Sequence, residues 1–91
     1  MMQLVHSLQV RRELLALKSR RPHCAVQAVG IIEEVRRNPA MNDGPPLPRD
    51  EWPLNAVRRN LRPPCTGRLV YRWSRSTQVI ELLAYYEPPR M

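Results

Sequence analysis

The stretch that decides the fold is Asn55–Arg90, with the sequence NAVRRNLRPPCTGRLVYRWSRSTQVIELLAYYEPPR. It is rich in Val, Ile, Leu, Tyr and Trp, and turn residues interrupt it at Pro63–Pro64, Thr66–Gly67 and Ser74–Thr77. Runs of β-branched and aromatic residues between turn signals predict strands. We therefore expect three short strands, with boundaries good to about 2–4 residues, near 55–62, 68–74 and 78–86.

Side-chain alternation along the first two of these strands separates an apolar face from an arginine face. The apolar side chains are Val57, Leu61, Leu69, Tyr71 and Trp73, and the opposite face carries Arg58, Asn60, Arg62, Arg68, Val70 and Arg72. The third strand is apolar on both faces apart from Glu81, so we expect it to be the most buried strand.

The same stretch concentrates the positive charge of the chain. The 91 residues carry 15 basic groups against 8 acidic ones, a net charge of +7, and every base except Lys18 is an arginine. Residues 52–91 hold seven of these bases and only two acids, Glu81 and Glu87. Guanidinium groups bind phosphate through two hydrogen bonds and stack on bases, so a basic sheet with aromatic residues indicates a surface for polyanions. The alternative is a solvated strand face whose arginines reflect composition alone.

Two amphipathic helices are predicted before the strands. Over residues 8–19, Val10, Leu14 and Leu17 recur at helical spacing, and Ser7 is suited to the N-cap position. Over residues 24–37, Asn38–Pro39 ends a helix whose apolar stripe consists of Ala25, Ala28, Val29, Ile32 and Val35. The short link between the helices makes them an antiparallel hairpin.

Two further segments have weaker patterns. Met1–His6 is short and mostly apolar, which suits either an edge strand or the frayed start of the first helix. Residues 39–53 hold half of the ten prolines together with Asn42–Gly44. They are therefore a connecting loop, which we expect Leu47 and Trp52 to pin to the core.

These elements are expected to form a single domain over residues 1–91. The helices need a sheet face to cover their apolar stripes. The predicted fold class is therefore α+β, a helical hairpin packed on a small, mainly antiparallel sheet of three to four strands. Its core should include Leu14, Leu17, Val29, Ile32, Val35, Leu69, Ile80 and Leu82.

The two cysteines and the hydropathy of the chain indicate the cellular compartment in which the protein is expected. Cys24 and Cys65 are far apart and follow no metal-ligand spacing, so we expect two reduced thiols in an intracellular, cytoplasmic protein, with a single disulfide as the alternative. No apolar run approaches the ~20 residues that span a bilayer, so no membrane partner is expected. Gly-rich phosphate loops, metal-ligand clusters and Ser/His/Asp arrangements are missing, which disfavours other enzyme classes and predicts no cofactor and no metal.

The order of these pieces resembles the RelE/ParE family of bacterial toxins. The resemblance covers nearly the whole chain, and no single piece is a specific motif. Its pieces are the helix LQVRRELLAL at 8–17, a second helix ending in VRRNP, the connection GPPL at 44–47, an arginine strand leading into GRLVYR, and VIELLAYY at 79–86. Arg68 matches an arginine that such toxins typically carry before an "xVxY" segment.

The resemblance implies a toxin of a toxin–antitoxin system. Members are typically endoribonucleases that cut mRNA on translating ribosomes, which here implies a metal-independent reaction on the basic sheet face. The alternatives are a gyrase poison of the ParE type, or a small basic phage or plasmid protein that binds nucleic acid or acts as an inhibitor without catalysis. A toxin of this charge also needs a small acidic antitoxin, expected to cover Arg58, Arg62 and Arg68.

The implied cleavage is an attack of the 2′-hydroxyl on the adjacent phosphate, which needs a proton acceptor, a proton donor and stabilisation of negative charge. We predict two sets of site residues: catalytic Arg68, Tyr86 and Arg90, and nucleic-acid-binding Arg58, Arg59, Arg62, Arg72 and Tyr85. Ribonuclease members often carry an "HR" segment after the last strand. Here that place reads YYEPPR, and the two histidines, His6 and His23, lie outside the matching positions.

Overall fold

The computed structural model describes residues 2–88, and the predicted catalytic Arg90 lies outside them. The elements are β1 (Gln3–His6), α1 (Leu8–Arg20), α2 (Pro22–Arg37), β2 (Val57–Asn60), β3 (Arg68–Ser74) and β4 (Val79–Tyr86). The strands form one sheet in the order β1-β4-β3-β2, in which β1 runs parallel to β4 and the other neighbours are antiparallel. The predicted α+β class is confirmed, and the segment before the first helix is the edge strand.

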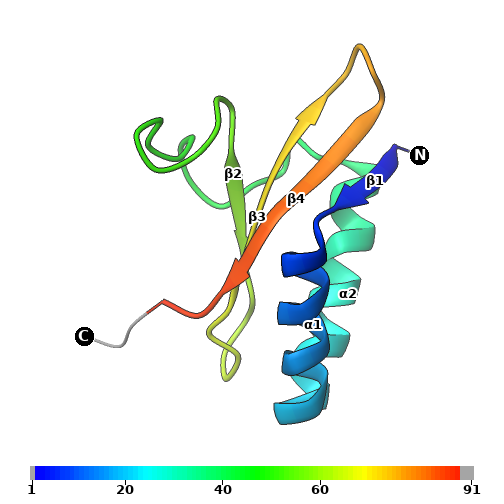
Figure 1. The fold of residues 1–91 in the computed structure, drawn as a ribbon, viewed down its shortest axis with the longest axis vertical. Helices are drawn as coiled ribbons and strands as arrows, with labels where there is room; N and C mark the ends of the chain where they lie inside the picture. The colour runs from blue at the N-terminus through cyan, green and yellow to red at the C-terminus, as the bar shows by residue number, and fades with distance from the viewer. Residues whose placement is uncertain (1, 89–91) are drawn as a thin grey trace.

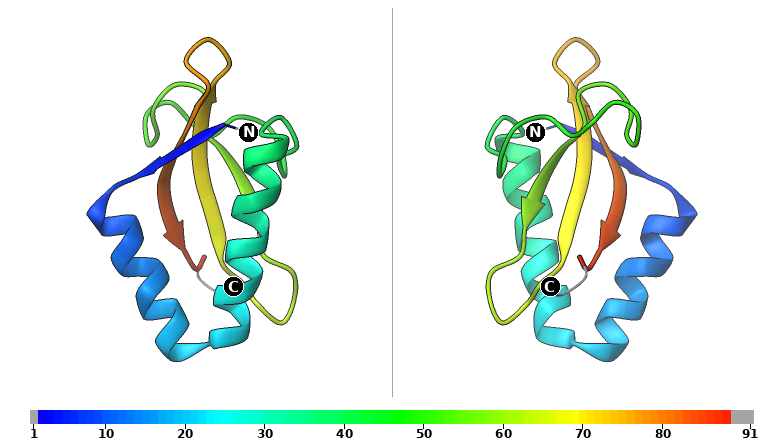
Figure 2. Two further views of the ribbon diagram at one scale, coloured as in Figure 1. Left: turned by 90° about the vertical axis from the view of Figure 1, so that its right-hand side faces the viewer. Right: turned by 90° about the vertical axis from the view of Figure 1, so that its left-hand side faces the viewer.

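The two helices form the expected hairpin on one face of the sheet (Figures 1 and 2). Ser7 caps α1, because its hydroxyl oxygen accepts a hydrogen bond from the Val10 amide at 3.2 Å. Arg21 alone separates the helices and serves as the C-cap of α1 and the N-cap of α2. Neither helix within residues 2–88 is long and apolar enough to cross a membrane.

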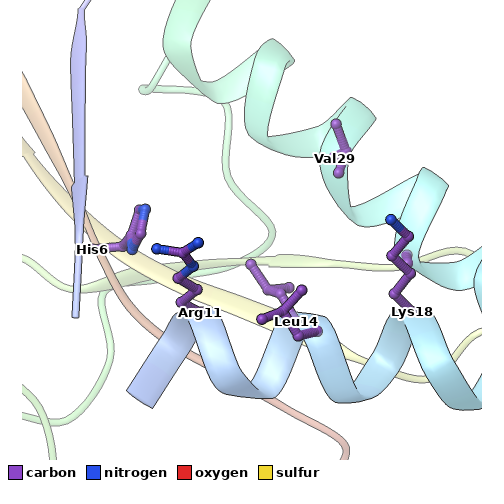
Figure 3. A pocket seen from close by; sticks show the side chains of 7 residues that line it. His6, Arg11, Leu14, Lys18 and Val29 are labelled. Atoms are coloured by element: carbon purple, nitrogen blue, oxygen red, sulfur yellow. The ribbon is translucent and has the colours of Figure 1, made fainter. Parts of the chain in front are cut away.

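The main core lies between the helices and the sheet. Six of the eight predicted core residues are buried there, and Leu14 is half-buried against them. The prediction is wrong for Val29, which is 59% exposed. The stripe that α2 turns to the sheet consists of Cys24, Ala28, Ile31, Ile32 and Val35. Val29 instead lines a surface cavity of about 210 Å³ between the helices, opposite Leu14 and Lys18 (Figure 3).

The cysteines correct a second expectation. Cys24 at the start of α2 and Cys65 in the connection between β2 and β3 form a disulfide, with Cα atoms 5.7 Å apart. The expectation of two reduced thiols was wrong because 41 positions of sequence separation conceal their proximity. The β2–β3 connection returns to the first turn of α2, so both cysteines enter the main core.

A β-bulge in β4 decides which side each tyrosine faces. Tyr71 of β3 pairs with Leu82, but its neighbour Val70 pairs with Ala84, so Leu83 is an extra residue in β4. A bulge shifts the alternation of the strand by one residue. After it, Tyr85 joins the core beneath the helices, whereas the side chain of Tyr86 belongs to the opposite face.

The segment between α2 and β2 crosses to the face of the sheet turned away from the helices (Figure 1). There Leu47 and Trp52 pack against Val70 in a second, smaller cluster. The Leu47 amide donates to the Ala56 carbonyl oxygen at 2.8 Å, which closes the loop on itself. Leu47 and Trp52 thus pin this loop to the sheet, as expected.

Candidate nucleic-acid interface

The sheet face turned away from the helices, called the open face below, carries a row of three polar side chains. Arg68 begins β3, and the register places it between Asn60 of β2 and Tyr86 of β4. Adjacent strands lie about 4.8 Å apart, so three side chains in such a row can reach one common phosphate group. Asn60 was not among the predicted site residues, although strand alternation had placed it on the arginine face.

Arg68 is the cation of this row. Its side chain is half-buried, and no ion pair or side-chain hydrogen bond joins it to another residue of the described chain. The residue before it, Gly67, packs directly on the ring of Tyr85. The start of β3 is therefore fixed from below by the core, while the Arg68 guanidinium stays available to a ligand.

Tyr86 is held in place by the loop. Its ring stacks on Trp52, with ring centroids 6.2 Å apart and an angle of 22° between the ring planes. Aromatic pairs at such a separation stabilise one another beyond the area they bury. Its hydroxyl group forms no hydrogen bond within residues 2–88. Trp52 thereby orients the ring of Tyr86, the residue of β4 that pairs with Arg68.

Arg58 lies on the same face, diagonal to Arg68 because it pairs with Val70. Its Nε donates to the carbonyl oxygen of Asp43 at 2.9 Å, and its guanidinium lies against Gly44. Gly44 has a φ of +110°, a backbone conformation that glycine tolerates best. Arg58 is thus tethered to the loop through one nitrogen and keeps its terminal nitrogens for a ligand.

Arg72 occupies the other end of β3 on the open face. Its Nε is 2.5 Å from a carboxylate oxygen of Glu81, its partner on β4. Val70, which lies between Arg68 and Arg72 along the strand, is covered by Leu47 and Trp52. Arg72 is therefore paired with an acid and separated from the row by an apolar cover.

Three predicted nucleic-acid-binding residues lie elsewhere. Arg59 points to the helix side and is 15% exposed, between Glu34 at 2.5 Å and Asp43 at 3.7 Å. Arg62 follows β2, where its backbone exchanges hydrogen bonds with the Gln27 side chain and its own side chain is exposed.

Tyr85 is the third of these residues. It is 3% exposed on the helix side, with its hydroxyl 3.4 Å from Glu87. Burial first, and the negative charge of Glu87 second, raise the pKa of Tyr85. It therefore remains neutral in the core and, in this position, offers no ring face to a base.

The open face thus combines a guanidinium, a phenol and an amide in one row. Such a set can bind a phosphate group, stabilise negative charge that develops on it and donate a proton. The two histidines lie on the helix side. His6 is at the end of β1 beside α1 (Figure 3), and His23 is in the first turn of α2. Within residues 2–88 the row therefore has no imidazole to accept a proton.

Comparison with known proteins gives a result for the fold. No protein-family model matches the sequence, and no curated protein does. A chain of the intact toxin–antitoxin complex RelBE from E. coli is 20% identical, with 99% of this chain and 100% of that chain covered and a TM-score of 0.76. The YoeB/ParE toxin from Agrobacterium tumefaciens is 22% identical, with 97% and 100% covered and a TM-score of 0.78.

The isolated RelE toxin from E. coli is similar as well. It is 19% identical, with all of this chain and 88% of that chain covered and a TM-score of 0.78. The predicted RelE/ParE fold is therefore confirmed.

Proposed function

We propose that this chain is the toxin of a toxin–antitoxin system and cuts mRNA on translating ribosomes with the Asn60–Arg68–Tyr86 row. The fold that it shares with the RelE and YoeB/ParE toxins supports the toxin role. The observation that carries the proposal is the position of Arg68. Its guanidinium has no ion-pair partner within residues 2–88, and the register places it between the Asn60 amide and the phenol of Tyr86, which Trp52 anchors.

Each member of the row has a distinct task in this reaction. The Arg68 guanidinium binds the scissile phosphate and stabilises the negative charge that grows on its oxygens as the 2′-oxygen attacks. The Tyr86 hydroxyl donates a proton to the departing 5′-oxygen, and the Asn60 amide orients the phosphate. The proton acceptor for the 2′-hydroxyl comes from outside the row, from the ribosome or from water.

The neighbouring arginines bind the RNA without touching the scissile bond. Arg58 contacts the adjacent phosphate with its terminal nitrogens, and the exposed Arg62, in the β2–β3 connection, extends the positive surface beyond the end of β2. Arg72 adds less, because the carboxylate of Glu81 already neutralises its charge.

One observation favours a second candidate, a ParE-type protein that poisons DNA gyrase without cutting nucleic acid. Within residues 2–88 the row has no histidine, and the carboxylates near it already have partners. Glu81 holds Arg72. Asp43 accepts a hydrogen bond from the backbone amide of Asn60 and pairs with Arg59. Without a proton acceptor of its own, the same basic face would serve to bind a protein.

Either kind of toxin implies a partner of opposite charge. Three of the similar structures are named as toxin–antitoxin complexes. We propose a small acidic antitoxin whose carboxylates pair with Arg58 and Arg68 on the open face and with Arg62 in the adjoining β2–β3 connection. Co-purification of a small acidic protein from the native host tests this proposal, and its absence would argue against it.

Two assays on the same purified protein separate the candidates. In a translation extract, mapping of new mRNA 5′ ends tests for cleavage, and a supercoiling assay tests for inhibition of gyrase. Cleavage that disappears in Arg68→Ala but persists in Arg11→Ala supports the ribonuclease. Inhibition of gyrase without cleavage supports the second candidate, and inactivity in both assays contradicts both.

A further inference from the structure

The first turn of α2 and the β2–β3 connection bring three metal-binding side chains together. One ligand atom from each of His23, Cys24 and Cys65 lies within 4.8 Å of the others. Both cysteines are almost completely buried, whereas His23 is exposed. The disulfide joins two members of this group and leaves the imidazole beside it.

We propose that His23, Cys24 and Cys65, once the disulfide is reduced, form a binding site for a thiophilic divalent cation, with Zn²⁺ as the expected ion. This site lies on the helix side of the molecule, away from the open face, and is independent of the proposed toxin activity.

The dimensions of the cluster fit a tetrahedral ion. Zn–S bonds of about 2.3 Å and Zn–N bonds of about 2.0 Å place the ligand atoms of one site about 3.5–3.8 Å apart. The three ligand atoms already lie within 4.8 Å of one another. After reduction, the two sulfurs therefore need to move apart only slightly to bind the ion. Within residues 2–88 the group has three members, and a water molecule would complete the coordination.

The position of Cys24 favours the thiolate that a metal requires. It lies in the first turn of α2, where the positive end of the helix dipole stabilises a negative charge. The N-cap residue Arg21 supplies no side-chain hydrogen bond to this helix end. A thiolate on Cys24, shared with a cation, would supply the missing negative charge.

The access route also fits. The sulfurs are shielded from solvent by the core, which protects a metal–thiolate centre from oxidation and competing ligands. His23 is the ligand at the surface, so the ion enters from its side. The side chain of His23 forms no hydrogen bond to any residue in the described part of the chain, so no contact has to break.

Reduction followed by metal binding converts the disulfide form into the metal-bound form. Two small thiols deliver two electrons to the Cys24–Cys65 bond and leave as their own disulfide, and each protein sulfur takes up one proton. Binding of Zn²⁺ then releases both protons, while two Zn–S bonds and one Zn–N bond form. The ion therefore replaces one tether between α2 and the β2–β3 connection with another. In a reducing compartment, where disulfides are rare, the metal would maintain this link.

The test titrates the reduced wild-type protein, held under argon with a phosphine reductant, with Co²⁺ and then Zn²⁺. We expect one equivalent of Co²⁺ to give a sulfur-to-metal charge-transfer band, and Zn²⁺ to abolish it. The oxidised protein should give no band. Loss of the imidazole in His23→Ala should weaken the Co²⁺ affinity roughly tenfold or more, and Cys65→Ser should reduce the band. His6→Ala, at the other exposed histidine, is the matched control.

Several outcomes would overturn the proposal. These are a reduced wild-type protein without the band, an unchanged affinity in His23→Ala, and equal binding by the oxidised and reduced forms. If reduction unfolds the metal-free protein, circular dichroism measures whether Zn²⁺ restores its secondary structure. Refolding on addition of Zn²⁺ supports the site, and a protein that stays unfolded contradicts it.

Discussion

Gly67 and Tyr85 pack so closely that a Cβ atom on Gly67 would overlap the phenol ring. Tyr85 is buried and cannot swing into solvent. Gly67→Ala should therefore destabilise the protein by about 1–3 kcal/mol, as overpacking does, and should displace the adjacent Arg68. Urea denaturation measures the change.

Gly30→Ala is the matched control for that substitution. A Cβ atom at Gly30, in the interior of α2, would meet no atom within 4 Å. Because alanine favours the helix over glycine, this variant should gain about 0.5–1 kcal/mol. Equal stability changes in the two variants would show that the contact between Gly67 and Tyr85 does not constrain the strand.

The role of Arg68 is testable by rate. If the chain is a ribonuclease, Arg68→Ala removes a group aimed at developing charge, which costs about 2.7–4 kcal/mol, a loss of about 100–1000-fold in cleavage. Its stability should hardly change, because the side chain has no partner in the described structure. Arg72→Ala, on the same strand but paired with Glu81, should lose much less activity. A similar loss in both variants would point to a diffuse charge effect.

Arg59 and Arg62 should respond in opposite ways. Arg59 lies between two acids on the helix side, so Arg59→Ala should lower the free energy of unfolding by about 1 kcal/mol. Arg62→Ala should leave stability nearly unchanged but weaken RNA binding and reduce the slope of affinity against salt by about one charge. Denaturation and filter binding over a salt series distinguish the two. A large drop in RNA affinity in folded Arg59→Ala would contradict the structural assignment.

Tyr71 makes stability fall at alkaline pH. Burial is the main cause that raises its pKa from 10.0 to about 12, with a smaller contribution from Asp43 and an opposing one from Arg59. The unfolded state therefore loses the phenolic proton first. The stabilisation is complete below pH 10 and is lost as the pH rises toward 12, by about 1.4 kcal/mol per pH unit.

The variant Tyr71→Phe tests whether ionisation of Tyr71 causes this loss of stability. It should be about 1 kcal/mol less stable near pH 8, because the hydroxyl no longer donates to the Pro39 carbonyl oxygen at 2.7 Å. Between pH 9 and pH 11 its stability should decline less steeply than that of the wild type, as measured by urea midpoints. Parallel curves would rule out Tyr71 as the titrating group.

Reduction of the disulfide should cost stability when no metal is present. Closing a loop between residues 41 positions apart stabilises the folded chain by about 4 kcal/mol on the chain-entropy account. Urea denaturation with a reductant and a chelator, compared with the oxidised protein, measures this difference. A difference near zero would mean that the unfolded chain is already restricted in this region.

The sequence predicted those elements whose apolar residues recur with a regular period. The α1 and α2 stripes and the alternation of β3 were sufficient for the fold class and for placing Arg68 on the open face. Alternation along β2 also places Arg59 on the helix face, together with Val57. The prediction that Arg59 binds nucleic acid did not take this into account. Nothing in the sequence indicated the bulge at Leu83. The residues around it are apolar at successive positions, so a shift of one residue leaves apolar side chains on both faces of the strand.

Contacts between residues that are far apart in the sequence could not be predicted from it either. Neither Cys24 nor Cys65 lies in a recognisable motif, and only the return of the β2–β3 connection to α2 brings them together. The stacking of Trp52 on Tyr86 likewise depends on the path of a proline-rich loop, which local patterns do not specify.

The parallel pairing of β1 with β4 has a consequence for biosynthesis. Of the four strands of the sheet, β1 is synthesised first, and its partner β4 is synthesised last. The helical hairpin, whose contacts are local, can form early, but its apolar face has no sheet to cover it until β4 arrives. In a protein proposed to attack translating ribosomes, the complete sheet, and with it the pairing of Arg68 with Tyr86, therefore forms only after β4 has left the ribosome.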